Sequence, residues 1–252
     1  MKRLCYGIVA GGAVSAGEVE KLRKKEQNIV WIAADSGAEV LWQNSVIPHL
    51  LIGDLDSLPE KTLRAIKSKG QTEIFRFLPE KDMSDTYLAL QAARLLQTGG
   101  IKALFAAWRD CHQPAASAEL EQLMKKAGSH KPQVVLLGAV GSRLDHSLSN
   151  LWILFDFIPE MELTVWTATS RIRAYSGQKE LHFKRKINYP FFSILPLSEK
   201  LEGLSLKGFR YPLNNQTITQ NQASWLLSNQ LTGKSATLKV RRGKFLVIRS
   251  RD

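Results

Sequence analysis

Short apolar runs alternate with segments of helical periodicity up to about residue 158, and this alternation limits the possible folds more than any other feature of the chain. Continuous apolar runs are typical of parallel strands buried on both faces, and the periodic segments between them are typical of covering helices. We therefore expect a parallel-sheet α/β domain. Its expected strands are residues 4–10, 29–34, 50–52, 74–77 and 134–137, and its expected helices are residues 36–42, 59–68, 84–97, 116–127 and 146–157.

The pattern of apolar residues in the sequence changes after Pro159. Short β-prone runs follow one another, separated by turn signals such as Ser176-Gly177 and Arg242-Gly243. This pattern predicts an all-β sandwich or barrel. We therefore expect two domains, residues 1–160 and residues 161–252. The expected strands of the second are residues 163–167, 172–175, 191–195, 237–241 and 245–248.

Cysteine content and hydrophobicity narrow the class of protein. Cys5 and Cys111 are the only cysteines, and they have neither metal-binding nor disulfide spacing. No apolar run reaches the roughly eighteen residues that a spanning helix needs, so we expect a cytoplasmic protein with no membrane partner. The start of the chain allows a second interpretation, a secretory signal with a cleavage site at Val14-Ser15-Ala16. Tyr6 and Gly7 interrupt its apolar run, which favours a buried first strand instead.

The charge of the chain is concentrated in its last third. Residues 161–252 hold 16 Lys and Arg against 5 Asp and Glu, whereas residues 1–160 hold 19 against 18. Such asymmetry fits a nucleic-acid partner, but it equally fits a basic face beside a polyphosphate site. Charge alone therefore does not identify the function.

Six acidic residues follow predicted strands of the first domain. In open α/β sheets the ligand crevice lies outside the carboxyl ends of the strands, so these side chains can converge on one site. Oxygen ligands without His or Cys partners suit Mg²⁺. Taken singly, each residue could be an ordinary turn or helix-capping residue. The six are Asp35, Asp54, Asp56, Asp82, Asp85 and Asp145.

The segment Lys81-Asp82-Met83-Ser84-Asp85 combines a cation with helix-start residues. Asp82 and Ser84 are natural N-caps for the helix that follows, and Asp85 would be favoured in its first turn by the helix dipole. The free N–H groups of a helix N-terminus also attract phosphate. Capping and ligand roles are therefore compatible here.

Residues 138–146 join a strand to a helix and contain Gly138 and Gly141, which leave backbone amides open to an anion. Arg143 adds a forked donor for phosphate oxygens, and Asp145 could orient it or cap the helix. His146 is either a proton carrier or a structural hydrogen-bonding group. The chain contains neither a P-loop nor the motifs of a protein kinase.

These segments, taken in order, resemble the motifs of thiamine pyrophosphokinases. The departures are Ser36 and Glu39, where the family usually has glycine and Asn, and a longer segment at residues 103–131. The matching segments are Ala34-Asp35-Ser36-Gly37-Ala38, Gly53-Asp54-Leu55-Asp56-Ser57, Lys81-Asp82-Met83-Ser84-Asp85, Gly141-Ser142-Arg143-Leu144-Asp145-His146, Leu204-Ser205-Leu206-Lys207-Gly208-Phe209-Arg210-Tyr211-Pro212-Leu213 and Ser228-Asn229.

The resemblance implies a nucleotide-binding α/β domain that holds ATP and Mg²⁺, a β-sandwich domain for thiamine binding and dimerisation, and a homodimer. The implied Mg²⁺ ligands are Asp54, Asp56 and Asp85, and the implied catalytic residues are these three with Asp82 and Arg143. The implied ATP-binding residues are Asp35, Ser36, Gly37, Lys81, Gly141, Arg143, Asp145 and His146.

Ser228 and Asn229 are implied to lie near bound thiamine. Trp225, three residues earlier, could stack on a thiamine ring, or it could be a buried core residue.

The resemblance predicts transfer of the pyrophosphoryl group of ATP to thiamine, with Mg²⁺ as cofactor and without a nucleic-acid partner. Two other functions remain open from the residues alone. One is nucleic-acid binding by the basic second domain. The other is a related Mg²⁺-dependent pyrophosphokinase or nucleotide hydrolase that uses the same loops.

Overall fold

The computed structural model describes residues 4–115, 117–125 and 131–252. The chain forms two compact units, Met1–Ala168 and Thr169–Asp252. The division falls later than the predicted boundary at residue 160, because strand β7 pairs in parallel with β6 and so belongs to the first unit. Three residues of the predicted helix 116–127, at positions 116, 126 and 127, lie outside the described residues.

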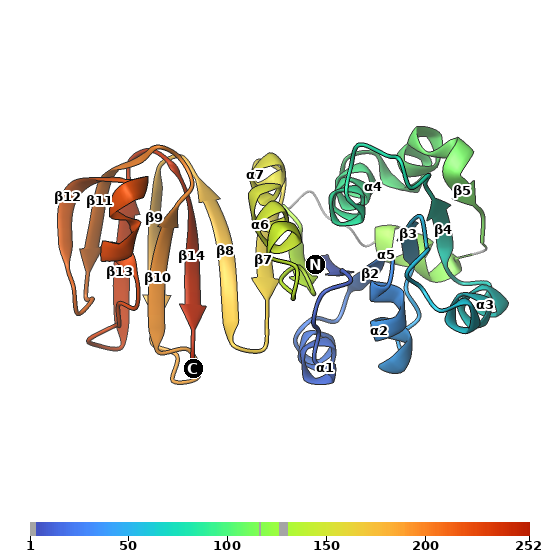
Figure 1. Cartoon of the computed structure of the whole chain (residues 1–252), viewed down its shortest axis with the longest axis horizontal. Helices are drawn as coiled ribbons and strands as arrows, with labels where there is room; N and C mark the ends of the chain where they lie inside the picture. Colours follow the sequence, from blue (N-terminus) through green and yellow to red (C-terminus); the bar gives the residue numbers. More distant parts are fainter. Residues whose placement is uncertain (1–3, 116, 126–130) are drawn as a thin grey trace. The chain divides into compact units, whose positions relative to one another are not determined.

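The first unit is built on a sheet with the strand order β7-β6-β1-β2-β3-β4-β5. All neighbouring strands are parallel except β4 and β5, which pair antiparallel. The predicted parallel-sheet domain is confirmed (Figure 1). The strands are β1 (Cys5–Val9), β2 (Ile29–Ala34), β3 (Leu50–Gly53), β4 (Glu73–Arg76), β5 (His112–Gln113), β6 (Gln133–Leu137) and β7 (Glu162–Trp166).

Helices cover both faces of this sheet. Figure 1 shows α1, α2 and α3 on one side of the parallel strands and α4 on the other. The core on the side of α1 to α3 includes Val19, Leu41 and Ile66, packed against Trp31 and Leu51 of the sheet. The helices are α1 (Ala16–Lys25), α2 (Gly37–Gln43), α3 (Glu60–Lys69), α4 (Asp85–Ala107), α5 (Ala118–Lys125), α6 (Leu144–Trp152) and α7 (Leu154–Phe157).

Two helix predictions need correction. The helix expected over 84–97 continues to Ala107, with a break in helical backbone at Gly100. The single helix expected over 146–157 is two short helices, α6 and α7. Helix α1 was not predicted, although Ser15 and Glu18 form a capping pair in which the Ser15 N–H donates to the Glu18 carboxylate at 3.1 Å.

The central position of β1 determines where a ligand can bind. β1 pairs with β2 on one side and β6 on the other, and all five of its residues are buried, which confirms the predicted buried strand. From β1 the chain proceeds through β2, β3 and β4 in one direction, and β6 and β7 lie in the other. The loops after β1 and β6 therefore lead in opposite directions from two adjacent strands. This is a topological switch point, where open α/β sheets bind ligands.

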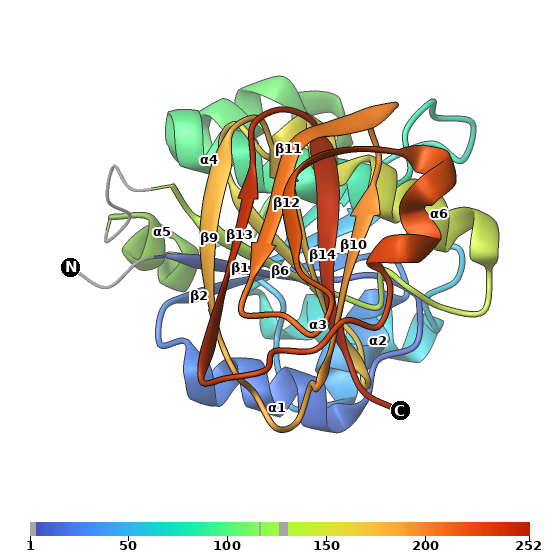
Figure 2. The same ribbon diagram turned by 90° about the vertical axis from the view of Figure 1, so that its left-hand side faces the viewer.

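The second unit is a β-sandwich, as predicted. One layer has the order β10-β14-β8 and the other has the order β12-β11-β13-β9. Figure 2 shows the four-stranded layer in front of β10 and β14. Phe192, Leu204, Leu238 and Phe245 are among the residues that fill the core between the layers. The strands are β8 (Ser170–Ser176), β9 (Lys179–Lys184), β10 (Phe191–Pro196), β11 (Lys200–Lys207), β12 (Leu213–Thr219), β13 (Ser235–Val240) and β14 (Lys244–Ser250).

No helix within residues 4–115, 117–125 and 131–252 combines the length and hydropathy that crossing a membrane requires.

A buried histidine connects the pH to the stability of the first unit. His49 is 6% exposed, and its Nδ1 accepts a hydrogen bond of 3.0 Å from the backbone N–H of Trp31 in β2. Burial lowers the pKa of His49 below its usual value, because the charged ring is poorly solvated there. Protonation would also place a hydrogen on Nδ1 and remove this acceptor.

We predict that the free energy of unfolding falls as the pH drops below about 6.5, the usual histidine pKa in an unfolded chain. The free energy of unfolding falls by about 1.4 kcal/mol for each pH unit over which His49 is protonated in the unfolded chain but neutral in the folded protein. His49→Asn keeps an acceptor for Trp31 but does not titrate, so urea unfolding of the variant should depend less on pH between 7 and 5. Equal pH dependence in both proteins would contradict this role.

Candidate active site

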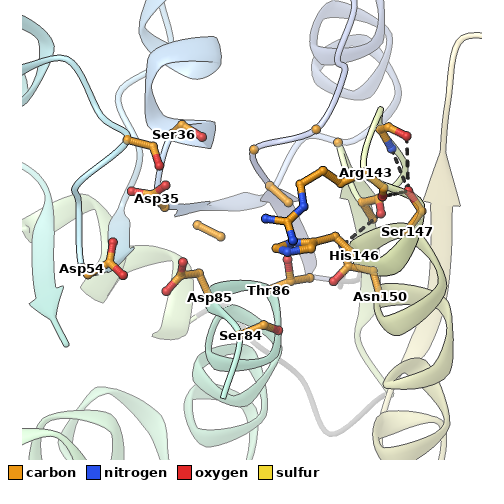
Figure 3. Close-up of a pocket in the computed structure, with 18 of the residues that line it drawn as sticks. Asp35, Ser36, Asp54, Ser84, Asp85, Thr86, Arg143, His146, Ser147 and Asn150 are labelled. Atoms are coloured by element: carbon orange, nitrogen blue, oxygen red, sulfur yellow. Dashed lines mark hydrogen bonds between the residues drawn. The ribbon is translucent and has the colours of Figure 1, made fainter. Parts of the chain in front are cut away.

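A pocket of about 660 Å³ lies at the carboxyl ends of β1, β2, β3 and β6. Figure 3 shows Asp35, Asp54 and Asp85 on one side of it and Arg143, His146, Ser147 and Asn150 on the other. One wall is thus acidic, and the other carries donors and a guanidinium group. The pocket belongs entirely to the first unit.

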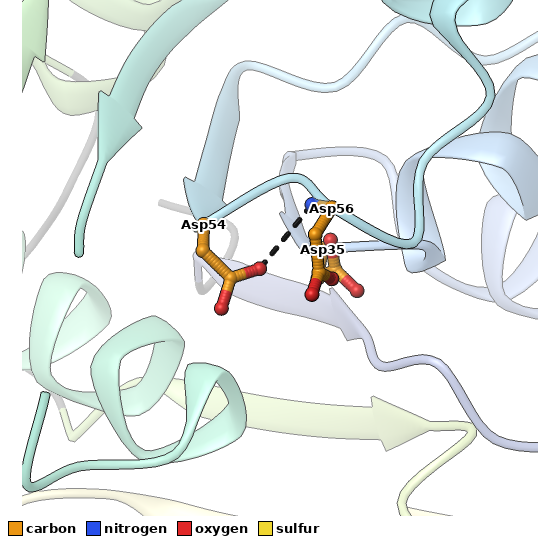
Figure 4. Close-up of side chains that lie close together, drawn as sticks. All are labelled: Asp35, Asp54 and Asp56. Carbon is orange, nitrogen blue, oxygen red and sulfur yellow. Dashed lines mark hydrogen bonds between the residues drawn. The ribbon is translucent and has the colours of Figure 1, made fainter. Parts of the chain in front are cut away.

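The loop after β3 presents two carboxylates to the pocket. Leu55 adopts a left-handed backbone conformation with φ of 66°, and its side chain is buried at 6% exposure. Its anchoring leaves Asp54 and Asp56, on either side, at the pocket surface (Figure 4). The Asp56 N–H donates to Oδ1 of Asp54 at 3.3 Å. Left-handed leucine is uncommon, and such strained residues cluster at functional sites.

Asp35 joins this pair from the end of β2. One carboxylate oxygen from each of Asp35, Asp54 and Asp56 lies within 4.8 Å of the others (Figure 4). Oδ1 of Asp35 is buried and has no hydrogen-bond partner among the described residues. An oxygen-only donor set with an unsatisfied buried oxygen fits Mg²⁺. The resemblance had implied Asp54, Asp56 and Asp85, so the structure adds Asp35 to the candidate ligands.

Asp85, in the first turn of α4, lies beside this cluster but is not among the three residues whose carboxylate oxygens come within 4.8 Å of one another. Ser84 caps this helix as predicted, since its hydroxyl accepts a hydrogen bond from the Tyr87 N–H at 3.2 Å. The ammonium Nζ of Lys81 lies 3.1 Å from Oδ2 of Asp54 and 3.1 Å from Oδ1 of Asp85. Lys81 therefore links the loop after β3 to the start of α4.

The electrostatics of the cluster favour a bound cation. Burial raises the pKa of Asp35 and of Asp85, and neighbouring carboxylates raise both further. Asp54 differs: partial burial opposes its ionisation, but hydrogen bonds from the Asp56 N–H and from Lys81 outweigh burial and lower its pKa. A divalent cation would stabilise all of these carboxylates in their charged form.

The opposite wall is made by loops that approach each other closely. The Gly12 N–H donates to the Gly138 carbonyl at 3.0 Å. A Cβ atom on Gly12 would lie 2.2 Å from that carbonyl oxygen, so no larger residue fits. From α6, Ser147 Oγ accepts from the Gly141 N–H at 3.0 Å and Asn150 donates to the Ala139 carbonyl at 2.9 Å. These buried side chains fix the glycine loop.

Arg143 is the cation of this wall. Its guanidinium contacts both carboxylate oxygens of Asp145, at 2.7 and 3.4 Å. Of the two roles predicted for Asp145, orienting Arg143 and capping the helix, the first is therefore confirmed. The hydrogen bond from Arg143 lowers the pKa of Asp145. Asp145 itself lies in the first turn of α6 and is not the N-cap, which is Arg143. His146 is exposed and lines the pocket beside them.

Most of the predicted first-unit residues come together in this pocket, but two do not line it. Gly37 is buried against β1, where an added Cβ would lie 2.0 Å from the Val9 carbonyl oxygen. Asp145 acts through Arg143. The predicted residues that line the pocket are Asp35, Ser36, Asp54, Asp56, Lys81, Asp82, Asp85, Gly141, Arg143 and His146.

The second unit holds the residues implied to lie near thiamine. Asn229 is 3% exposed, and its side-chain amide binds the backbone N–H and carbonyl of Tyr211 at 3.0 and 2.9 Å. Ser228 has a left-handed φ of 53° and is exposed. Trp225 is 67% exposed, so the alternative that it is a buried core residue is wrong.

Sequence reasoning missed several pocket residues. Gly11 and Gly12 follow β1 just as Asp35 follows β2, so their position after a strand was the available signal. Thr86, Ser147 and Asn150 carried no such signal, because they lie inside helices.

The fold and the pocket define a two-domain enzyme in which an α/β unit with an acidic, glycine-walled site precedes a β-sandwich. The family description "Thiamin pyrophosphokinase, catalytic domain" matches residues 21–166, and "Thiamin pyrophosphokinase, vitamin B1 binding domain" matches residues 178–245. The chain therefore belongs to the thiamin pyrophosphokinase family.

Individual relatives agree with this assignment. A thiamine pyrophosphokinase of Bacillus subtilis is 27% identical over 229 residues, which cover 90% of each chain. A crystal structure of thiamine pyrophosphokinase from Bacillus subtilis has a TM-score of 0.75 at 25% identity, and covers 98% of this chain and 99% of its own. The yeast thiamin pyrophosphokinase structure shares the fold, with a TM-score of 0.74 at 15% identity over 100% of this chain and 87% of its own.

Gly53 provides a test of the acidic wall. Its φ of 147° is rarely adopted by other residues, and a Cβ there would lie 3.2 Å from both the Asp35 Cβ and Oδ1 of Asp85. We predict that Gly53→Ala weakens Mn²⁺ binding measured by calorimetry, because both carboxylates must shift. The backbone strain should also lower the free energy of unfolding by about 1–2 kcal/mol.

Gly70→Ala is the matched control, since Gly70 has φ of 63° and no atom within 4 Å of the added Cβ. It should lose stability but keep wild-type Mn²⁺ affinity. Similar Mn²⁺ affinities in the two variants would show that metal binding does not require Asp35 and Asp85 to pack closely against Gly53.

Proposed function

We propose that this protein transfers the pyrophosphoryl group of ATP to the hydroxyl of thiamine, giving thiamine diphosphate and AMP. The observation that carries the proposal is the acidic cluster facing a glycine-rich wall with Arg143 across one pocket. Such a pocket suits a polyphosphate together with a divalent cation. Membership of a family with both a catalytic and a vitamin B1 binding domain supports the two substrates.

In this proposal Mg²⁺ is held by Asp54, Asp56 and Asp85, with Asp35 beside them. The cation supplies neutralisation of phosphate charge. Lys81 and Arg143 bind the nucleotide's phosphate oxygens, and the Gly12 and Gly141 segments allow backbone N–H groups to approach them. These groups orient the phosphate chain for in-line attack, which is the main requirement of phosphoryl and pyrophosphoryl transfer.

The primary alcohol of thiamine attacks the β-phosphorus of ATP, and AMP leaves. The alcohol proton passes to a carboxylate, and two candidates line the pocket. Asp82 is exposed on the loop before α4, and Asp85 is a candidate only where Mg²⁺ does not fully engage it, because a bound cation would favour its charged form. A strong base is not required for this reaction.

Thiamine recognition is assigned to the second unit. Trp225 offers an exposed indole to a cationic or aromatic ring. Ser228 and Asn229 lie three and four residues after Trp225, and the Asn229 amide is held by the backbone of Tyr211. The rigid placement of Asn229 would define one edge of a thiamine site.

We also propose a homodimer. Leu144, Leu148 and Trp152 are spaced four residues apart on α6, and they are 69%, 46% and 55% exposed. This spacing places them on one face of the helix. Exposed apolar stripes are characteristic of surfaces buried by a partner, and a second copy of this chain is the partner that the family resemblance implies.

Turnover provides the first test. Incubation of the protein with Mg²⁺, ATP and thiamine should give AMP and thiamine diphosphate in equal amounts. Asp54→Ala should lower the rate at least about a hundredfold, since a group that stabilises the reacting phosphates is lost. Glu60→Ala, which removes an exposed carboxylate on α3 outside the pocket, should leave the rate unchanged.

The other functions give different outcomes. Release of phosphate without thiamine diphosphate would indicate a nucleotide hydrolase. Salt-sensitive RNA binding without ATP turnover would indicate a nucleic-acid-binding protein. Wild-type rates in Asp54→Ala would end the assignment of Asp54 as a metal ligand.

The role of Trp225 gives a separate prediction. Because the side chain is exposed, Trp225→Ala should keep the fold, and loss of ring stacking should raise the KM for thiamine about tenfold. The KM for ATP should stay the same. Trp225→Phe keeps an aromatic face and should recover most of the affinity. Equal effects on both KM values would argue against a thiamine contact.

A further inference from the structure

The ammonium group of Lys81 occupies the space between two carboxylates that are proposed to hold Mg²⁺. It lies 3.1 Å from Asp54 and 3.1 Å from Asp85. The three side chains are only 13%, 15% and 26% exposed, so water screens their interactions less than it would at an open surface. An ammonium and a divalent cation cannot occupy this position together, because they would repel strongly at such short range.

The two carboxylates are held more firmly than the lysine. Asp54 is fixed by the Asp56 N–H, and Asp85 belongs to the first turn of the long helix α4. Lys81 instead lies in the loop between β4 and α4, in which Leu78 and Met83 are 76% and 44% exposed. A loop with so few buried side chains moves at low cost, and lysine itself has a long flexible stem.

We propose that Lys81 is an internal cation that Mg²⁺ displaces from Asp54 and Asp85, and that the displaced ammonium then binds the phosphate chain of the nucleotide. The inference rests on the proposed function for the identity of that nucleotide. Lys81 thereby couples metal binding to nucleotide binding. It is a positioning residue in this role, because it controls access of the cation to the carboxylates.

The coupling follows from the exchange of partners. Without a nucleotide, Mg²⁺ must break two ion pairs of Lys81 and leave its ammonium without a carboxylate. With a nucleotide bound, the ammonium gains phosphate oxygens in their place. Each ligand therefore raises the affinity for the other by the same factor, as thermodynamic linkage requires, and such factors are typically 5–150-fold.

The accessibility of Lys81 tests the displacement directly. Reductive methylation with formaldehyde, followed by mass spectrometry, measures how fast each lysine reacts, and exposed Lys61 serves as the internal reference. Lys81 should react slowly without divalent cation and about fivefold or more faster with saturating Mg²⁺ alone. It should become slow again with Mg²⁺ and a non-hydrolysable ATP analogue. An unchanged rate under Mg²⁺ concentrations that saturate the site would overturn the proposal.

Binding measurements on Lys81→Met test the coupling. The variant should bind Mn²⁺ about tenfold more tightly than wild type, and the factor by which the ATP analogue tightens Mn²⁺ binding should fall towards one. Arg76→Met is the matched control, since Arg76 is a nearby cation whose side chain donates to the Asp54 backbone carbonyl, at 3.3 Å, and not to its carboxylate. Its Mn²⁺ affinity should stay close to wild type. Equal affinities of Mn²⁺ for wild type and Lys81→Met, or equal gains in both variants, would refute the displacement.

The experiments separate this inference from the proposed function. The methylation rate with Mg²⁺ alone and the Mn²⁺ affinity of Lys81→Met involve neither ATP nor thiamine. They can therefore support the displacement of Lys81 even where the turnover assay yields no thiamine diphosphate. Conversely, turnover with an unmoved Lys81 would retain the proposed function and reject the inference.

Discussion

The pairing of β1 with both β2 and β6 is the constraint on which the rest of the first unit depends. It places the loops after three adjacent strands at one edge of the sheet. Gly12 and Gly138 then approach to hydrogen-bonding distance, and Cβ atoms on them would lie 2.2 and 2.4 Å from backbone oxygens. Ser147 and Asn150 hold the glycine loop from the side of α6, so the loop is fixed from two directions.

Electrostatic repulsion and backbone strain destabilise the acidic wall. Asp35, Asp54 and Asp56 bring like charges within 4.8 Å, and Asp35 and Leu55 adopt left-handed backbone conformations with φ of 49° and 66°. Burial of Leu55 offsets part of this cost, as does the ion pair of Lys81 with Asp54. The repulsion between these carboxylates is therefore concentrated where a bound cation can relieve it. The arrangement favours cation binding and lowers the stability of the folded protein without the cation.

The parallel strands of the first unit were predictable because burial on both faces requires continuous apolar runs, as in 29–34 and 134–137. The two-residue antiparallel strand β5 and the strands β9, β11 and β12 were missed. Only alternate residues of β9 are partly buried, and β11 has register shifts between Leu201 and Leu206 that break a period of two. In the site, Asp54 and Asp85 were predictable from their positions near strand ends. The Lys81 contacts were not, since they depend on how a loop packs in three dimensions.

The distribution of charge distinguishes the two units chemically. Thr169–Asp252 contains 16 Lys and Arg against 4 Asp and Glu, whereas the first unit contains 19 of each. Under the proposed function, the affinity of the first unit for an anionic nucleotide therefore cannot come from its net charge. It must come from local groups, namely Arg143 oriented by Asp145, the amides of the glycine loop, and cations held by the acidic wall. In the proposed function such a site would recognise the shape of a phosphate chain, because each charge of the chain would have to meet a partner at short range.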